Sequence, residues 1–283
     1  MIYSKDIKIL KIDNDNQKNL SQIIKNTNNT WQANRSEKEK FSDSKIGKQA
    51  EDVFEKFVNV EDNLYFYLPY DDFRIDNFEN HAPFDGLYVN KNTSLNDINS
   101  IKNKINHIMK KNKYGKLYFL DFLRKDMRKL GIFIVEVKST RLKENNKKNN
   151  QINFDKIKNH DFLSYPKLLR KTENQNFNEI DYINISKQKG IANINQEEKD
   201  NTADILVRVY IDEKKQEASL IGYITNKNFI ENKVLKKMVQ KNKSEQALYW
   251  SVPIYKGKPI SNLIKNKNTI NTKNTIKNKQ KYN

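Results

Sequence analysis

The stretch that decides the fold is Gly131-Ile132-Phe133-Ile134-Val135-Glu136-Val137-Lys138-Ser139-Thr140-Arg141, an apolar run with two charges near its end. The run is short for a helix and rich in β-branched and aromatic residues, so it predicts a strand buried on both faces. Side chains alternate along a strand, so Glu136 and Lys138 project from one face, about 7 Å apart, and Val135 and Val137 from the other. Charges at the end of a buried strand are costly, and open α/β sheets bind ligands at that end. We therefore expect the two charges to serve chemistry.

Hydrophobic periodicity predicts the elements around this strand. We expect an edge strand within residues 1–12, an amphipathic helix over 45–58 capped by Asp43 or Ser44, a strand over 64–68 and another within 81–89. Two helices with apolar stripes at 98–108 and 120–130 follow, and Gly131 ends the second. A right-handed crossover between the flanking strands is one topology that this order allows. Later we expect a hairpin of strands at 205–211 and 218–224 and a helix over 229–238. The predicted fold class is α/β, a mixed β-sheet core flanked by helices.

The chain has 283 residues, enough for one full core, and we expect one large domain with tails. Residues 1–44 form an N-terminal strand and polar extension, residues 45–240 form the core, and residues 241–283 form a C-terminal segment. The Lys-, Asn- and Thr-rich composition from residue 265 onward is typical of disorder.

The charge balance favours a polyanionic partner. There are 53 Lys and Arg against 35 Asp and Glu, a formal net charge of +18. A/T-rich coding would also enrich lysine, but it would enrich glutamate equally, and glutamate does not balance the lysines. The absence of cysteine excludes disulfides, thiolate zinc sites and a cysteine nucleophile. Charges interrupt the first ten residues, and no segment approaches membrane-spanning length, so we expect a cytoplasmic protein without membrane contact.

Two further carboxylates are candidates for the same site. Asp85 follows Pro83-Phe84 and precedes Gly86, between apolar runs, where an aspartate is unusual for a strand. The alternative is an ordinary turn aspartate before the strand begins. Glu51 lies beside the apolar stripe of the helix over 45–58, where it could reach the boundary between helix and sheet; the alternative is a solvated surface carboxylate.

Together these residues resemble the PD-(D/E)XK nuclease superfamily. Pro83-Phe84-Asp85 corresponds to the first half of its motif, with one extra residue between the proline and the aspartate, and Glu136-Val137-Lys138 corresponds to the second half. The resemblance covers roughly residues 45–238, and the later apolar cluster and paired strands look most like small bacterial type II restriction endonucleases. It implies a restriction-endonuclease-like fold and a metal-dependent DNA endonuclease.

The resemblance also implies roles for the individual residues. Asp85, Glu136 and the backbone carbonyl of Val137 would be hard oxygen ligands for Mg²⁺, with Mn²⁺ as a substitute ion. Lys138 would orient or deprotonate the attacking water and offset developing charge. Glu51 would bind the metal through water or adjust a second ion. The alternative is that Glu136 and Lys138 form a structural ion pair.

The expected partner is double-stranded DNA, and a symmetric target favours a homodimer. Lys48, His81, Arg141 and Lys143 are the candidate DNA contacts, although each could equally be a solvated surface group. A restriction enzyme would also have a companion DNA methyltransferase. Two other functions stay open: another nuclease of the same fold, such as a junction resolvase or repair nuclease, and a basic nucleic-acid-binding protein without catalysis.

Overall fold

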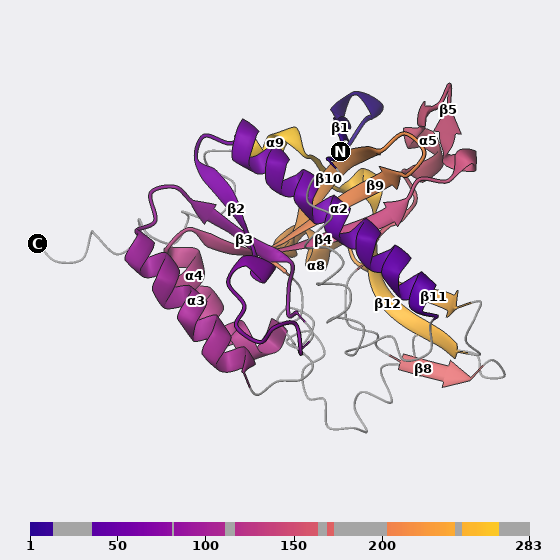
Figure 1. Ribbon diagram of the computed structural model, residues 1–283. Helices are drawn as coiled ribbons and strands as arrows, with labels where there is room; N and C mark the ends of the chain where they lie inside the picture. Colours follow the sequence, from indigo (N-terminus) through magenta and orange to yellow (C-terminus); the bar gives the residue numbers. More distant parts are fainter. Residues whose placement is uncertain are drawn as a thin grey trace, which may run out of the picture.

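Helices flank a curled mixed β-sheet in the computed structural model, which describes residues 1–13, 36–80, 82–110, 117–163, 169–172, 203–240 and 245–265 (Figure 1). The strands of this sheet, in spatial order, are β1 (Lys8–Lys11), β10 (Glu217–Thr225), β9 (Ile205–Asp212), β4 (Ile132–Arg141), β3 (Gly86–Asn90) and β2 (Tyr65–Pro69). The short strand β13 (Lys258–Pro259) also pairs with β10. The strands expected in residues 1–12, at 64–68 and 131–141, and in the hairpin after residue 204 are confirmed.

Strand β4 lies at the centre of the sheet and sets its direction. It pairs antiparallel with β3 and parallel with β9, and the other pairs of this sheet within the described residues are antiparallel. Because β3 and β4 are antiparallel neighbours, the right-handed crossover that the element order allows between them is not the topology present. The parallel partner of β4 is β9, which comes much later in the chain.

The two faces of β4 pack against different helices. Phe133, Val135 and Val137 belong to the cluster that packs against α2 (Glu37–Glu61), the long helix across the front of Figure 1. Ile132 and Ile134 face the other way, against α3 (Leu95–Met109) and α4 (Asp121–Lys129). The apolar half of β4 is thus buried on both faces, as the sequence predicts.

The helix ends follow from capping. Ser94 accepts a hydrogen bond from the backbone of Asp97 and begins α3, and Gly131, at φ +74°, follows the end of α4 as expected. Helix α2, however, begins at Glu37 and not near residue 45. Ser36 and Glu39 form a capping box that starts the helix two turns earlier than its apolar stripe indicates.

A second sheet consists of β11 (Val234–Gln240), β12 (Glu245–Pro253), β7 (Asp161–Leu163) and β8 (Leu169–Thr172). The helix expected over 229–238 is therefore wrong: α8 (Asn226–Asn232) is short, and every residue of β11 pairs with β12. The remaining short elements are η1 (Ser4–Asp6), η2 (Tyr70–Asp72), η3 (Leu117–Leu120), η4 (Glu144–Asn146), β5 (Lys147–Lys148), β6 (Gln151–Ile152), α5 (Phe154–Ile157), η5 (Ile254–Lys256) and α9 (Ser261–Lys265).

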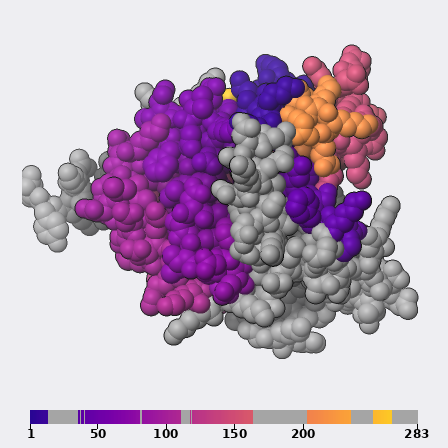
Figure 2. Space-filling view, viewed as in Figure 1, coloured from indigo at the N-terminus to yellow at the C-terminus, as the bar shows by residue number. Residues whose placement is uncertain are grey.

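Early and late parts of the chain close the core together. The side chain of Ile2 lies against Gly222 and Gly257, and Leu263 of α9 joins the cluster under α2. In the space-filling view the indigo N-terminal residues lie beside orange residues of the β9–β10 hairpin (Figure 2). The domain boundaries expected at 44/45 and 240/241 fall within α2 and within the β11–β12 hairpin. The expected tail from residue 266 lies outside the described residues.

Candidate active site

Asp85 lies where β3 and β4 separate. The ladder between these strands ends at the pair Gly86 and Val135, and the backbone N–H of Asp85 still donates to the Val135 carbonyl at 3.2 Å. The Asp85 carboxylate accepts a hydrogen bond of 2.6 Å from the backbone N–H of Val137. The Tyr70 N–H of η2 donates to the Asp85 carbonyl at 2.9 Å. Asp85 therefore precedes the strand, as the turn alternative has it, yet its side chain is fixed to β4.

The backbone of Val137 also lies at the point where β3 and β4 separate, which we call the fork. The N–H and C=O of one strand residue point to the same edge of the strand. Because the Val137 N–H points to Asp85, the Val137 carbonyl points to that side too, beyond the last β3–β4 pair. The fork thus brings a carboxylate and a backbone carbonyl to one place.

Glu136 and Lys138 lie on the face of β4 opposite to α2. The Lys138 ammonium donates to the Glu136 carboxylate, and the two side chains are 23% and 22% exposed, respectively. Such partial exposure leaves the pair open to a ligand. Burial raises the pKa of Asp85, and the charge of Glu136 raises it further.

Helix α2 and η2 contribute a second ion-pair group. Lys48 donates to Glu51 at 2.6 Å and also to Asp71. Burial opposes the charged form of Lys48, but the charges of Glu51 and Asp71 outweigh it and raise its pKa. The pKa of Glu51 is raised to about 7, because burial and the charge of Asp71 together outweigh the lowering effect of Lys48.

The hydroxyl of Tyr67 is buried and lies within the field of several carboxylates. Tyr67 of β2 is 2% exposed, packs edge-on against Phe54, and has a buried hydroxyl that finds no hydrogen-bond partner among the described residues. Burial raises its pKa, and so do, in decreasing order, the charges of four carboxylates: Glu51, Asp85, Glu55 and Glu136. Buried hydroxyls are normally bonded, so this one indicates space for a polar ligand.

The site therefore concentrates negative potential. Burial raises the pKa of Asp85 well above its usual range, and the charges of Glu136 and Glu51 raise it further. Lys138 and the Val137 N–H lower it without cancelling the effect. A cation bound among these carboxylates would relieve the repulsion.

The donor set fits Mg²⁺ better than a metal that needs a full protein cage. Within the described ranges, no three His, Cys, Asp or Glu side chains are placed to hold an ion together. Mg²⁺ typically takes one or two carboxylates and keeps several waters. Asp85 and Glu136, with the Val137 carbonyl, are such a set, and the free Tyr67 hydroxyl could bond a water of the ion's shell.

The candidate DNA contacts that the structure describes lie in different places. Lys48 lies at the site, held by two carboxylates. Arg141, at the end of β4, bonds Asp43 at 2.7 Å and Glu213 at 3.1 Å, and Lys143 is exposed just beyond it. His81 lies outside the described residues. Their contacts with DNA stay predictions.

Sequence reasoning missed two residues of this site. Tyr67 was visible only as one of several aromatic residues in a strand, and Asp71 only as part of an acidic turn. The alternation of 64–68 places Tyr65 and Tyr67 on one face, but which face meets the site depends on the pairing with β3.

The raised pKa of Glu51 predicts a pH dependence of stability. Its pKa in the folded protein is about 7, above the ordinary value of 4.5, so ionising Glu51 opposes folding and stability falls as pH rises from 4.5 through 7. We expect Glu51→Gln to remove this fall and to raise the free energy of unfolding of the metal-free protein at pH 8 by about 3 kcal/mol. Urea unfolding at pH 5 and pH 8 measures it. Glu61→Gln, at an exposed position of α2, is the control, and an equal change at both pH values would contradict the prediction.

Gly86 is required by the position of Tyr67. A Cβ at Gly86 would lie 2.4 Å from the Tyr67 hydroxyl and from Cζ of the ring. We expect Gly86→Ala to push the ring out of the site and to lower the free energy of unfolding by about 1–3 kcal/mol. Gly47→Ala is the matched control: it meets no atom within 4 Å and lies inside α2, so it should stabilise by about 0.5–1 kcal/mol. Two equal changes in urea unfolding would show that the Tyr67 contact is not tight.

Comparison with known proteins gives no assignment: no family model, no curated protein and no solved structure matches this chain. Within the described part of the chain, no helix combines the length and apolar character needed to cross a membrane.

Proposed function

We propose that the protein is a Mg²⁺-dependent endonuclease that hydrolyses phosphodiester bonds of double-stranded DNA, with a restriction-endonuclease-like fold of the PD-(D/E)XK type. One observation carries the proposal. Asp85 is bonded to the backbone of Val137, between Glu136 and Lys138, so residues far apart in sequence meet where two strands separate. The mixed sheet with helices on both faces supports the same conclusion.

Each residue of this site has a role in the proposed reaction. Asp85, Glu136 and the Val137 carbonyl would hold Mg²⁺, which supplies a polarised phosphoryl oxygen and a more acidic water. Lys138, anchored by Glu136, would hold the attacking water and then face the negative charge that develops on the phosphorus oxygens. Glu51, paired with Lys48, would bind the metal through a water or adjust a second ion.

The proposed substrate implies an arrangement of two sites. Cutting both strands of a symmetric target uses one active site per strand, so we propose a two-fold homodimer on DNA. The net charge of +18 supports binding to the phosphate backbone.

A binding protein without catalysis is the second candidate, and the ion pair between Lys138 and Glu136 is consistent with it, because a purely structural pair would look the same. This alternative predicts salt-sensitive DNA binding that Glu136→Gln leaves unchanged, and no product that depends on Mg²⁺.

Digestion of unmethylated linear DNA of diverse sequence, with Mg²⁺ or with EDTA, separates these functions. Discrete fragments that disappear with EDTA support a restriction enzyme, and their ends locate the site. If the protein binds duplex without cutting it, a four-way junction is the next substrate. Inertness on both would refute the nuclease proposal and leave the binding protein.

A further inference from the structure

Arg208 is a buried cation to which the proposed active site, with its metal ligands and Lys138, gives no role. It lies in β9, where every residue is buried, and is itself 6% exposed. Arg208 is in register with Lys138 across the parallel pair of β4 and β9. Residues that lie opposite each other in two paired strands project their side chains from the same face of the sheet. Arg208 therefore projects beside Lys138, on the face that also carries Glu136.

The guanidinium of Arg208 is only partly satisfied. One terminal nitrogen donates to the Thr140 hydroxyl at 2.5 Å, and the guanidinium also interacts with the Tyr210 hydroxyl and lies 5.3 Å from the centre of that ring. The Tyr210 hydroxyl in turn bonds His160 at 2.6 Å. Within the described part of the chain, the buried Nε of Arg208 makes no hydrogen bond, and none of the ion pairs includes Arg208.

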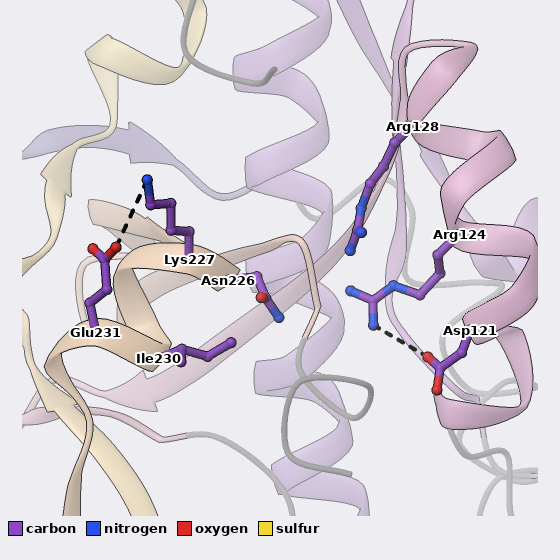
Figure 3. A pocket seen from close by; sticks show the side chains of 7 residues that line it. All are labelled: Asp121, Arg124, Arg128, Asn226, Lys227, Ile230 and Glu231. Carbon is purple, nitrogen blue, oxygen red and sulfur yellow. Dashed lines mark ion pairs between the residues drawn. The ribbon is translucent and has the colours of Figure 1, made fainter. Parts of the chain in front are cut away.

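Two other arginines with buried side chains, Arg74 and Arg124, are paired with carboxylates, and so is the more exposed Arg128. Arg74 bonds Asp76 at 2.7 Å and Asp71 at 3.1 Å. Arg124 and Arg128 both bond the buried Asp204, at 3.1 and 2.5 Å. These two arginines reach from α4 into a cavity of about 370 Å³ that α8 closes on its other side, where Figure 3 shows them pointing toward Asn226. Arg208 differs from all three.

An unpaired cation in this place is costly, and Lys138 beside it adds like-charge repulsion. The Glu136 carboxylate does not offset both, because Lys138 already bonds it. A guanidinium with free N–H groups matches the oxygens of a phosphate, which would neutralise the charge and complete the hydrogen bonds.

We propose that Arg208 binds a backbone phosphate of the DNA strand next to Lys138. The identity of the phosphate rests on the proposed function. The interaction is non-covalent: N–H groups of Arg208 donate to non-bridging oxygens and so position the strand against Glu136 and Lys138. Arg208 is therefore a binding residue placed inside the sheet, unlike the exposed Lys143.

The proposal makes two measurable statements about the full chain. With a labelled duplex in EDTA, Arg208→Met should weaken binding and make the slope of log K against log salt shallower by about 0.9, the value for one lost phosphate contact. Without DNA, the same variant should unfold at an unchanged or higher temperature, because it removes an unpaired buried charge. A purely structural arginine would show a lower unfolding temperature and an unchanged salt slope.

Two further variants keep the test decisive. Lys8→Met removes one exposed charge on β1, which β10 and β9 separate from β4, and measures the effect of net charge alone. Arg208→Gln keeps a hydrogen-bond donor near Thr140. If Arg208→Met and Arg208→Gln both lower the unfolding temperature, or if neither changes the salt slope beyond Lys8→Met, the proposal is overturned.

The same measurements separate this proposal from the nuclease assignment. A shallower slope for Arg208→Met, in a protein that never cuts DNA, keeps the phosphate site and refutes the nuclease. Cutting by the wild type together with an unchanged slope keeps the nuclease and refutes the phosphate site. A wild type that does not bind DNA refutes both.

Discussion

Replacing Asp85 with Asn is expected to lower the rate of Mg²⁺-dependent cleavage by at least about 10²-fold and to stabilise the metal-free protein. The first effect follows from the loss of a charged metal ligand. The second follows from the raised pKa of Asp85, which burial and the charges of Glu136 and Glu51 produce. Asn cannot ionise and so avoids this cost. Single-turnover cleavage and thermal unfolding measure the two effects.

The sign of the stability change depends on pH. Because the pKa of Asp85 is higher in the folded protein than in the unfolded chain, stability is lost as pH rises through the folded-state value. Wild type and Asp85→Asn should thus be alike near pH 4 and diverge toward pH 8. Mg²⁺ should stabilise the wild type and not the variant. Asp126→Asn, at an exposed position of α4, is the control; a less stable Asp85→Asn at pH 8 would mean that the Val137 bond outweighs the repulsion.

Lys138→Met should lower the cleavage rate by about 10²–10⁴-fold, because it removes the group that holds the water and faces the developing charge. It also leaves Glu136 without its partner and removes the attraction that lowers the pKa of Asp85. The matched control is Lys56→Met on α2. It breaks the exposed ion pair between Lys56 and Asp13 and should leave the rate unchanged.

A double variant distinguishes chemistry from structure at this pair. If Glu136 and Lys138 served only the fold, replacing both, as Glu136→Gln with Lys138→Met, would restore what the single change costs. We expect the double variant to recover stability and to stay inactive. A double variant that cuts DNA at the wild-type rate would refute the catalytic role.

The sequence predicts those parts of the fold that local patterns determine. The apolar stripe of α3 and the Gly131 stop both act within a few residues, and the structure has them as expected. The error at β11 has a physical cause: Val234 and Leu235 suit either a helix or a strand, and pairing with β12 decides between them. The start of α2 was misplaced because its first turns are polar and a capping box, not an apolar stripe, begins the helix.

The residues of the site were likewise predictable only where a local sequence pattern places them. Glu136 and Lys138 could be placed on one face from the strand period alone, and Asp85 stood out as an acid between apolar runs. Tyr67 and Arg208 could not be assigned, because their roles depend on which strands are neighbours. A charge inside the apolar run 205–211 was nevertheless a visible signal for Arg208. Only the parallel register of β4 and β9 sets it beside Lys138.

The closing of the core by Ile2 and Leu263 bears on how the protein is made. Contacts between such distant parts of a chain cost loop-closure entropy and slow folding. Strand β4 is complete at Arg141, but the cluster beneath α2 also requires Leu263. At about 5–20 residues per second of synthesis, the ribosome needs on the order of ten seconds to travel between these points. During that interval the apolar cluster beneath α2 lacks Leu263, so the nascent chain exposes apolar surface that favours aggregation and chaperone binding.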